Sequence, residues 1–152
     1  MLNYVHLEHV DSTNAYLQRQ QSEDDICNCV VSADEQTAGK GMGSNSWESE
    51  VGKNLTFSLA LDMGFLPAER QFLLSEAVPL GIIEVLDDIL PSEKLSIKWP
   101  NDIVASVDGG PYRKLAGILT EMRLEEREIR DIVIGTGLNI NQTEFPEEIR
   151  ET

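Results

Sequence analysis

The residues of this chain that are best suited to chemistry fall in four short polar segments, each of which follows a strand-like run. They are DSTN (11–14), QTAGKGMGSNSW (36–47), KWPND (98–102) and RKLAGIL (113–119). Glycines let a backbone approach a ligand closely and turn its N–H groups toward an anion. A lysine beside such a loop adds a point charge for a phosphate or a carboxylate. These residue types make an anionic ligand one candidate for the site.

The glycine-rich segment, residues 36–47, matches neither of two common phosphate motifs. The P-loop needs G-x-x-x-x-G-K-[ST], which GKGMGSN does not fit. The dinucleotide fingerprint needs G-x-G-x-x-G at the start of a helix. Here Gly39, Gly41 and Gly43 form G-x-G-x-G, and no helical pattern follows them. The glycines alone therefore leave two interpretations open, an anion-binding loop and a flexible surface loop.

The polar segments must be positioned by the strands and helices around them. Apolar runs and alternating apolar and polar residues predict strands over residues 3–10, 26–36, 54–61, 94–100, 101–107, 113–126 and 127–141. A helix is expected to start at Asp11 or Ser12, because both are good N-cap residues. Residues 68–89 form the longest helical candidate, in which Pro79 and Gly81 allow a kink or a break.

The predicted strands and helices mingle without a strict βαβ rhythm, and residues 113–141 look like a long hairpin. We therefore predict an α+β fold with a mixed, mainly antiparallel sheet and helices on one side. The chain suits a single domain, residues 1–152. A further helix is predicted to begin at Pro146, and the chain is expected to end in the middle of that element.

The composition limits the partners of this chain. Its net charge of −15 comes from 27 Asp and Glu residues against 12 Lys and Arg residues. Nucleic-acid backbones are bound by clustered Lys and Arg, so a nucleic-acid partner is not expected. No apolar run reaches the ~18 residues of a membrane span, and no signal peptide is visible, so we expect a cytoplasmic protein without a membrane partner. Cys27 and Cys29 are predicted to be reduced core thiols, because a metal site needs further ligands at other spacings.

The order of the polar segments is more specific than any one of them. Along the chain, DSTN, ADEQTAGKG, GKNLTFSLAL, IKWPNDI, KLAGILTE and IGTGLNIN resemble the catalytic domain of biotin protein ligases over about residues 3–141. KWPND followed by K-L-A-G-I-L-x-E is highly specific to that family. The related lipoate ligases share the fold but lack this pair of motifs. The resemblance implies a mixed-sheet fold like that of class II aminoacyl-tRNA synthetases.

The resemblance implies an ATP-dependent ligase that works in two steps. Biotin and ATP, with Mg²⁺, give biotinyl-5′-AMP and pyrophosphate. A lysine of a biotin carboxyl carrier protein then attacks the mixed anhydride, forms an amide and releases AMP. Two alternatives stay open, a biotin-binding fragment of such a ligase without turnover and a relative that transfers lipoate or an octanoyl group.

The resemblance also gives roles to residues by their positions in the motifs. Lys114 is implied to bridge the biotin carboxylate and the α-phosphate of ATP, where a cation lowers the repulsion between two anions. Asp102 is implied to help activate the acceptor lysine, which must lose a proton before it attacks. Ser12, Thr13 and Asn14 suit the ureido ring of biotin, and the same residue types suit a helix N-cap. The residues implied to contact biotin or its adenylate are Ser12, Thr13, Asn14, Gln36, Gly39, Lys40, Gly41, Met42, Trp47, Asn101, Gly117 and Asn139.

The glycine-rich segment departs from the family in its cations. Many members read G-R-G-R-R-G-R-x-W where this chain reads G-K-G-M-G-S-N-S-W, so only the first cation survives, as Lys40. Met42 stands in place of an arginine that helps to hold the adenylate. We therefore expect weaker retention of the adenylate, with Lys40 and Lys114 doing most of the anion binding. Trp47 is expected to anchor the end of the loop under the ligand.

Two further family features bear on the rest of the protein. Some members carry an N-terminal helix-turn-helix domain and repress transcription, and members usually end with more helix and a small SH3-like domain. Neither is visible in this sequence. We therefore expect a monofunctional ligase domain that binds no DNA and is incomplete at its C-terminus. Many relatives dimerise through sheet edges, so a homodimer is among the assemblies that the resemblance implies.

Overall fold

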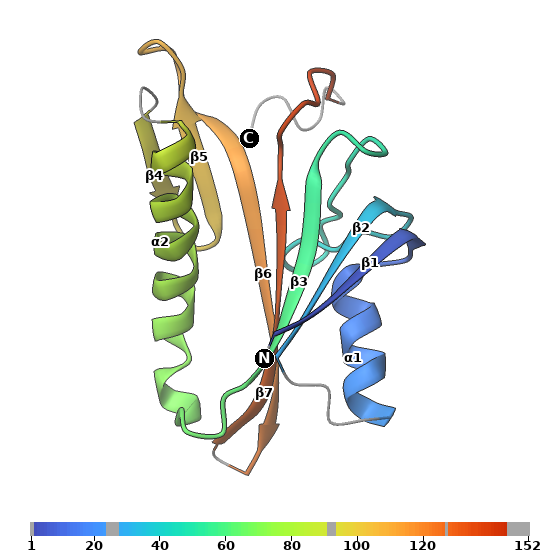
Figure 1. Ribbon diagram of the computed structural model, residues 1–152. Helices are drawn as coiled ribbons and strands as arrows, with labels where there is room; N and C mark the ends of the chain where they lie inside the picture. The colour runs from blue at the N-terminus through green and yellow to red at the C-terminus, as the bar shows by residue number, and fades with distance from the viewer. Residues whose placement is uncertain (1, 24–27, 91–93, 127, 146–152) are drawn as a thin grey trace.

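The computed structural model describes residues 2–23, 28–90, 94–126 and 128–145, which form one seven-stranded sheet with helices (Figure 1). In chain order the elements are β1 (Asn3–Val10), α1 (Thr13–Glu23), β2 (Cys29–Gln36), β3 (Leu55–Asp62), the 3-10 helix η1 (Ala68–Arg70), α2 (Phe72–Ile89), β4 (Lys94–Lys98), β5 (Asp102–Ser106), β6 (Arg113–Glu125) and β7 (Glu128–Leu138). The strand order is β1-β2-β3-β7-β6-β5-β4. β1 and β2 are parallel and the other neighbours are antiparallel. The predicted mixed, mainly antiparallel α+β fold is therefore confirmed.

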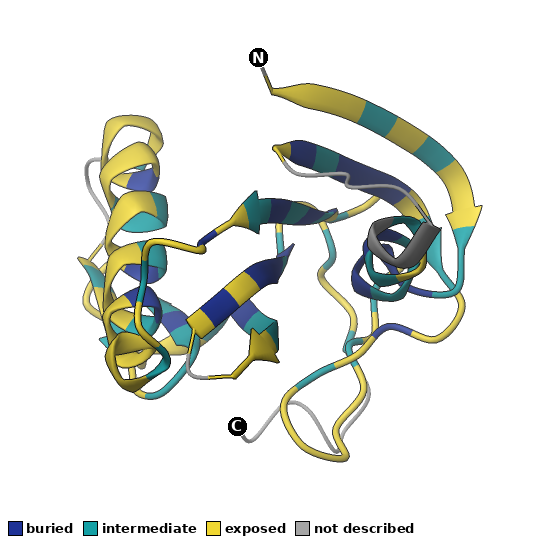
Figure 2. Ribbon diagram, turned by 90° about the horizontal axis from the view of Figure 1, so that it is seen from below, coloured by how far each residue is buried: buried dark blue, intermediate teal, exposed yellow. Residues whose placement is uncertain are grey.

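The two α-helices of the described residues pack on opposite faces of the sheet (Figure 2). The core beneath α1 contains Leu17 and Val133, whereas the core beneath α2 contains Leu86, Ile132 and Ile134. Successive residues of a strand point to opposite faces, so these neighbours in β7 assign one helix to each face. The prediction that the helices lie on one side was wrong. A continuous apolar run in a central strand leaves both faces of the sheet to be covered.

Most of the other element predictions are confirmed, with small changes. The helix expected over 68–89 is a 3-10 turn followed by α2, which continues without a break through the buried Pro79. The strand expected over 26–36 is described from Cys29, a buried free thiol whose pKa is raised by burial. Cys27 and the helix predicted from Pro146 lie outside the described residues. Within the described ranges, no helix is long and apolar enough to cross a membrane.

An irregularity between β5 and β6 turns a lysine toward the α1 face. Ile103 pairs with Ala116 but Val104 pairs with Lys114, so Leu115 has no partner in β5. Leu115 and Ala116 both contribute to the core beneath α2. Such a bulge redirects the neighbouring side chains, and Lys114 therefore points to the other face of the sheet, where the pocket lies.

Candidate active site

A large pocket, of about 1320 Å³, opens on the α1 face of the sheet beside the start of that helix. Its walls come from the first turn of α1, the glycine-rich loop, the β4–β5 turn and the central strands β6 and β7. Single small-ligand sites usually measure ~300–1,000 Å³, so this pocket has room for two substrates side by side. All but Gly39 of the site residues predicted from the sequence line it, namely Ser12, Thr13, Asn14, Gln36, Lys40, Gly41, Met42, Trp47, Asn101, Asp102, Lys114, Gly117 and Asn139.

Local interactions hold the first turn of α1 at the pocket. Ser12 Oγ accepts a long bond, 3.5 Å, from the backbone N–H three residues further on, which makes Ser12 the predicted N-cap. The Arg19 guanidinium donates to both carboxylate oxygens of Asp11, at 2.7 and 2.9 Å. These bonds lower the pKa of Asp11 to about 2, so its carboxyl group is ionised at neutral pH. Ser12, Thr13 and Asn14, which follow Asp11 in the chain, are buried, each with 3% of its surface exposed.

Five side chains from four elements form a hydrogen-bonded group that we call the amide cluster: Thr13, Asn14, Gln36, Ser58 and Glu121. Gln36 Oε1 accepts from the Thr13 backbone N–H at 2.8 Å. Ser58 Oγ lies 2.7 Å from Thr13 Oγ1 and 2.5 Å from Asn14 Oδ1. Asn14 Nδ2 donates to Glu121 Oε2 at 2.8 Å. The cluster thus ties α1 to β2, β3 and β6.

The amide cluster has fewer hydroxyl protons than close oxygen contacts. Besides the two contacts of Ser58, Thr13 Oγ1 lies 3.0 Å from Gln36 Oε1. These three contacts share the two hydroxyl protons of Ser58 and Thr13, because amide oxygens only accept. One contact therefore lacks a proton, but each amide oxygen still has a donor, Ser58 Oγ for Asn14 and the Thr13 N–H for Gln36. Amide and hydroxyl oxygens carry two lone pairs each, so the cluster can accept further N–H groups from a neutral ligand.

Ser58 and Glu121 were not predicted as site residues. Ser58 is fully buried in a β3 row that it shares with the buried Thr56 and Ala60, and a polar residue at such a position was the available signal. Glu121 is the glutamate of the K-L-A-G-I-L-x-E motif, so its position had been noted without a role. Its partner Asn14 lies 107 residues away in the sequence. No local pattern specifies a contact over that distance.

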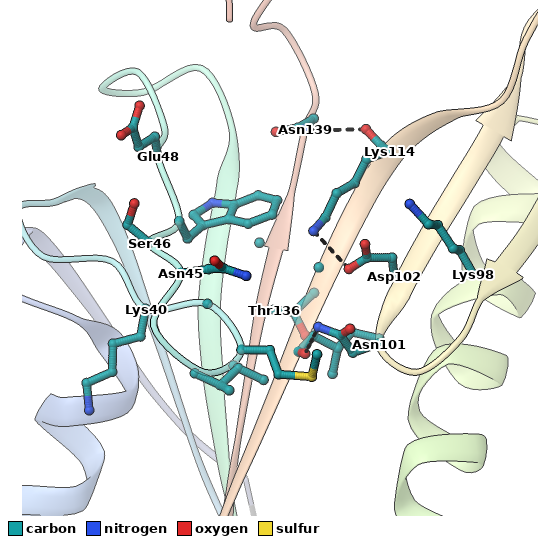
Figure 3. A pocket seen from close by; sticks show the side chains of 18 of the residues that line it. Lys40, Asn45, Ser46, Glu48, Lys98, Asn101, Asp102, Lys114, Thr136 and Asn139 are labelled. Carbon is teal, nitrogen blue, oxygen red and sulfur yellow. Dashed lines mark hydrogen bonds and ion pairs between the residues drawn. The ribbon is translucent and has the colours of Figure 1, made fainter. Parts of the chain in front are cut away.

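Three side chains at the ends of adjacent strands form what we call the charged cluster: Lys98, Asp102 and Lys114. Lys114 Nζ lies 2.8 Å from Asp102 Oδ1, and these side chains are 30% and 16% exposed. Lys98 pairs with Asp102 between β4 and β5 and extends toward the same space (Figure 3). Two ammonium groups against one carboxylate make this end of the pocket positive, in a chain whose net charge is −15. Lysines act as point charges for phosphates, so the charged cluster suits a polyanion.

Asn101 anchors the turn that carries the charged cluster. The Asn101 side-chain Nδ2 donates to the Ile118 carbonyl at 3.1 Å, and the Asn101 backbone carbonyl accepts from the Ile118 N–H at 2.8 Å. These two bonds extend the β5–β6 pairing by one residue and fix Asp102, which follows directly in the chain. The predicted contact of Asn101 with substrate stays a prediction.

The Trp47 indole lies against the backbone of β6 and β7. A Cβ placed on Gly137 would come within 2.1 Å of the ring, and one placed on Gly117 within 2.8 Å. These two glycines pair with each other across the strands. Lys114 Nζ lies 5.6 Å from the ring centroid, which adds a cation–π attraction. Gly117, predicted as a substrate contact, therefore makes room for Trp47.

The glycine-rich segment folds back on itself, and we call residues 39–47 the loop hairpin. The Trp47 N–H donates to the Gly39 carbonyl at 2.9 Å, and the Gly41 N–H donates to the Asn45 carbonyl at 2.8 Å. A Cβ on Gly39 would come within 2.3 Å of the Trp47 carbonyl oxygen. Gly39 thus lies at the base of the loop hairpin rather than in the pocket wall, because only glycine permits this close backbone approach.

The surviving cation of the loop hairpin is not part of the charged cluster. Lys40 Nζ lies 3.6 Å from Glu121 Oε1, and its side chain points away from Lys114 and Asp102 (Figure 3). Lys98, rather than Lys40, extends toward Lys114 and Asp102 (Figure 3). The sharing of anion binding between Lys40 and Lys114 stays a prediction.

Two buried polar atoms of the pocket have no partner within the described part of the chain: Trp47 Nε1 and Asn139 Oδ1. The other end of the Asn139 amide is used, because its Nδ2 donates to the Lys114 carbonyl at 3.3 Å. An unpaired buried polar group costs about 1–3 kcal/mol. A ligand that brings an acceptor to the indole and a donor to the amide oxygen removes that cost.

Comparisons with known proteins agree with this arrangement. Residues 7–139 match the model of the Biotin/lipoate A/B protein ligase family. The chain belongs to this family. The match spans both clusters of the pocket and the loop hairpin between them.

Individual members of the family resemble the chain at moderate identity. The bifunctional ligase/repressor BirA of Bacillus subtilis is 36% identical over 124 residues, which cover 80% of this chain and 36% of that protein. The biotin--[acetyl-CoA-carboxylase] ligase of Mycobacterium tuberculosis is 34% identical over 141 residues, 91% of this chain and 48% of that protein. The structure of the Aquifex aeolicus biotin protein ligase in complex with biotin and ATP matches with a TM-score of 0.74 and 31% identity, covering 98% of this chain and 57% of that one. The chain thus spans about half or less of the length of the curated relatives.

Proposed function

We propose that this chain forms the biotin and ATP site of a ligase that makes biotinyl-5′-AMP and transfers the biotinyl group to a lysine of a biotin carboxyl carrier protein. The observation that carries the proposal is that one pocket holds both a buried, hydrogen-bonded group of hydroxyls and amides and a cluster of positive charge. Biotin has the matching parts, a ureido ring with two N–H groups and a carboxylate at the end of its tail. The names of the ligases to which the chain is similar support the same reaction.

The amide cluster supports biotin over lipoate as the acid that is activated. The ureido N–H groups can donate to the second lone pairs of Thr13 Oγ1 and Asn14 Oδ1, and the Ser12 hydroxyl can donate to the ureido carbonyl. The dithiolane ring of lipoate has no N–H or carbonyl group and would cover these polar side chains without hydrogen-bonding to them, which costs free energy. Lipoate should therefore bind more weakly than biotin at this end of the pocket.

The charged cluster supports the adenylation step. A carboxylate oxygen of biotin attacks the α-phosphorus of ATP, the bond between that phosphorus and the α,β-bridging oxygen breaks, and pyrophosphate leaves. Lys114 lies where it can neutralise both the carboxylate and the α-phosphate, and Lys98 can hold the leaving pyrophosphate. Preorganised cations lower the barrier because they stabilise the charge that gathers in the transition state.

The transfer step needs a proton acceptor. The acceptor lysine has an ordinary pKa of ~10.4 and arrives protonated, so it must lose a proton before its nitrogen attacks the mixed anhydride. Asp102 is a carboxylate in the pocket wall, only 16% exposed, and its neighbour Lys114 fixes its position. We assign Asp102 to accept that proton, after which AMP leaves and the amide forms.

Adenylation of this kind uses ATP with Mg²⁺, and the residues of the pocket fit an ion that is held mainly by phosphates. Mg²⁺ is often bound by one or two carboxylates together with substrate phosphates. Among the described residues there is no group of three or more His, Cys, Asp and Glu side chains that could hold a metal. Asp102 would be the carboxylate that holds the ion beside the triphosphate, and the ion would neutralise charge on the leaving pyrophosphate.

We further propose that the protein forms a homodimer through a sheet edge and does not bind DNA. β1 and β4 are the edge strands of the sheet, and unpaired edges are templates for strand addition. The charge of −15 opposes contact with a phosphate backbone. Sedimentation of the full-length protein, and a gel-shift assay at low salt, test these two statements separately.

The test of the proposed function uses the full-length protein that contains this chain. It is incubated with biotin, ATP, Mg²⁺ and a purified biotin carboxyl carrier domain, and the mass of the carrier is measured. We expect one biotinyl group per carrier and one pyrophosphate released per transfer. Absence of transfer, or transfer of lipoate in preference to biotin, would contradict the proposal. Binding of biotin without pyrophosphate release would leave only the alternative of a non-catalytic biotin-binding protein.

A further inference from the structure

Glu121, a member of the amide cluster, also contacts the loop hairpin. Its Oε2 accepts from Asn14 Nδ2 at 2.8 Å, and its Oε1 lies 3.6 Å from Lys40 Nζ. Each oxygen of the carboxylate thus serves a different part of the pocket. Glu121 itself does not line the pocket.

The contact with Glu121 sets the orientation of the Asn14 amide. A carboxylate only accepts hydrogen bonds, so Nδ2 must face Glu121 and Oδ1 must face the opposite way. A longer contact from Asn14 Nδ2 to the Leu119 carbonyl, 3.4 Å, also favours this orientation of the amide. Oδ1 is then directed at Ser58 Oγ, 2.5 Å away. The acceptor that a ureido N–H would use is therefore held in place from behind by Glu121.

The contact with Lys40 ties the loop hairpin to the sheet. The Lys40 and Glu121 side chains are 45% and 30% exposed, and an ion pair this exposed stabilises a fold by little. A weak pair suits a contact that forms when the loop hairpin closes over the pocket and breaks when it opens. Lys40 reaches Glu121 from the first arm of the loop hairpin, next to Gly39, which bonds to Trp47.

The two contacts share the cost of ordering one side chain. A free glutamate side chain loses rotamer entropy when it is fixed. A ligand that fixes Asn14 also fixes Glu121, and the pair with Lys40 then forms at a lower entropic cost. By thermodynamic reciprocity, closure of the loop hairpin must favour the ligand to the same degree.

We propose that Glu121 is a positioning residue that orients Asn14 for the ureido ring and couples occupation of the ring site to closure of the loop hairpin over the pocket. The proposal rests on the proposed function, because it takes the ligand of the amide cluster to be biotin. It gives the glutamate of the K-L-A-G-I-L-x-E motif, which lies in β6, a role in ligand binding.

The test compares three variants of the full-length protein: Glu121→Gln, Lys40→Gln and, as a control with the same change of charge, Glu126→Gln. Glu126 is exposed at the turn between β6 and β7, outside the pocket. Biotin affinity is measured by calorimetry without ATP. Closure is measured by hydrogen exchange of the backbone in residues 37–54, with and without biotin.

Each variant has a distinct expected result. For Glu121→Gln we expect a biotin Kd about 10-fold higher, because the carboxylate that accepts from Asn14 is replaced by a weaker, neutral acceptor, and no slowing of exchange when biotin binds. For Lys40→Gln we expect the slowing to be lost while the Kd rises by no more than about 3-fold, because an exposed pair contributes little. Glu126→Gln should match the parent in both measurements. If Glu121→Gln does not fold, the Lys40→Gln result alone decides the coupling.

The failures of the two proposals are distinguishable. A parent protein that does not bind biotin contradicts the proposed function, whatever the variants do. A parent that binds biotin, with an unchanged Kd in Glu121→Gln, overturns the positioning role while the function stands. A raised Kd in Glu121→Gln with normal slowing of exchange overturns the coupling to the loop hairpin.

Discussion

The two clusters of the pocket recognise ligands by opposite means. The amide cluster is buried, with Thr13, Asn14 and Ser58 at 3%, 3% and 0% exposure, and most of its polar atoms already have partners. The charged cluster is partly open to solvent and consists of one ion pair with a second lysine beside it. One end of the pocket is built in advance for a neutral ring, and the other holds charge ready for anions.

The difference follows from the energetics of burial. A neutral hydroxyl or amide can be buried at little cost when it is hydrogen-bonded. A buried charge costs much more unless it is fully paired, so Lys98 and Lys114 keep contact with water until a ligand displaces it. Removing a group from the charged cluster should therefore affect chemistry most, and disturbing the amide cluster should affect binding and stability.

The largest expected effect comes from Lys114→Ala. Removing the cation between the carboxylate and the α-phosphate should slow pyrophosphate release by on the order of 100-fold or more, by analogy with the loss of other preorganised groups that stabilise transition-state charge. Biotin affinity should fall by no more than about 3-fold, because the carboxylate would pair with Lys114 in a partly exposed site, while the ureido ring binds at the other end of the pocket. Time-point assays of released pyrophosphate measure the rate, and calorimetry measures the biotin affinity.

The control for Lys114→Ala is Lys94→Ala, which removes an exposed lysine at the start of β4, outside the pocket. It should leave both quantities unchanged. Unaltered pyrophosphate release in Lys114→Ala would refute the role of that lysine. A large loss of biotin affinity in the same variant would show that the two clusters are not separate.

Gly135→Ala should disturb the amide cluster without touching a charge. The new Cβ would come within 2.2 Å of Asn14 Oδ1, so the amide must move. Overpacking of this kind costs about 1–3 kcal/mol of stability, and we expect biotin affinity to fall about 10-fold through a misplaced hydrogen bond. Chemical denaturation and calorimetry check the two effects. Gly81→Ala is the matched control, because a Cβ there meets nothing within 4 Å and should stabilise the exposed helix slightly.

Met42→Arg should strengthen the charged end of the pocket. Met42 lies in the pocket wall, and a guanidinium there can pair with phosphate through two hydrogen bonds. We expect biotinyl-5′-AMP to dissociate about 10-fold more slowly, measured by release of labelled adenylate through a gel-filtration column. Val51→Arg adds the same charge at an exposed position outside the pocket and should not slow release. An unchanged rate in Met42→Arg would mean that the departure from the family at this position does not limit retention.

The two clusters also differ in how far the sequence predicted them. The strands, the sheet type and the charged cluster were predictable because their patterns are local, and Asp102 and Lys114 lie in short motifs at the ends of neighbouring strands. The amide cluster depends on Ser58 and Glu121, whose bonds to Asn14 span 44 and 107 residues. Such contacts follow from the register of strands that are far apart in the sequence. The direction of Lys40 depends in the same way on a partner that no local pattern names.

The smallest expected effect tests whether the amide cluster depends on the ion pair between Asp11 and Arg19 at the start of α1. The pKa of Asp11 is about 2 in the folded chain, lowered mainly by its hydrogen bonds from Arg19, against ~3.9 for a free aspartate. A lowered pKa stabilises the fold at pH values above the free value, and the stabilisation is lost as the pH falls through about 2. Because the Asp11 and Arg19 side chains are 45% and 53% exposed, we expect only about 0.5–1 kcal/mol.

Asp11→Asn should therefore lower the free energy of unfolding by that amount at pH 7 and leave it nearly unchanged at pH 2, as measured by urea denaturation at both values. Arg19→Gln should give the same loss, and the double variant should lose no more than either single one, because both remove one ion pair. A loss that persists at pH 2 would assign the effect to packing rather than charge. Since the same residue precedes Ser12 and Thr13, a rise in biotin Kd at pH 7 would show that the ring site is held in place partly by this pair. An unchanged Kd would mean that the bonds to Gln36, Ser58 and Glu121 hold the site by themselves.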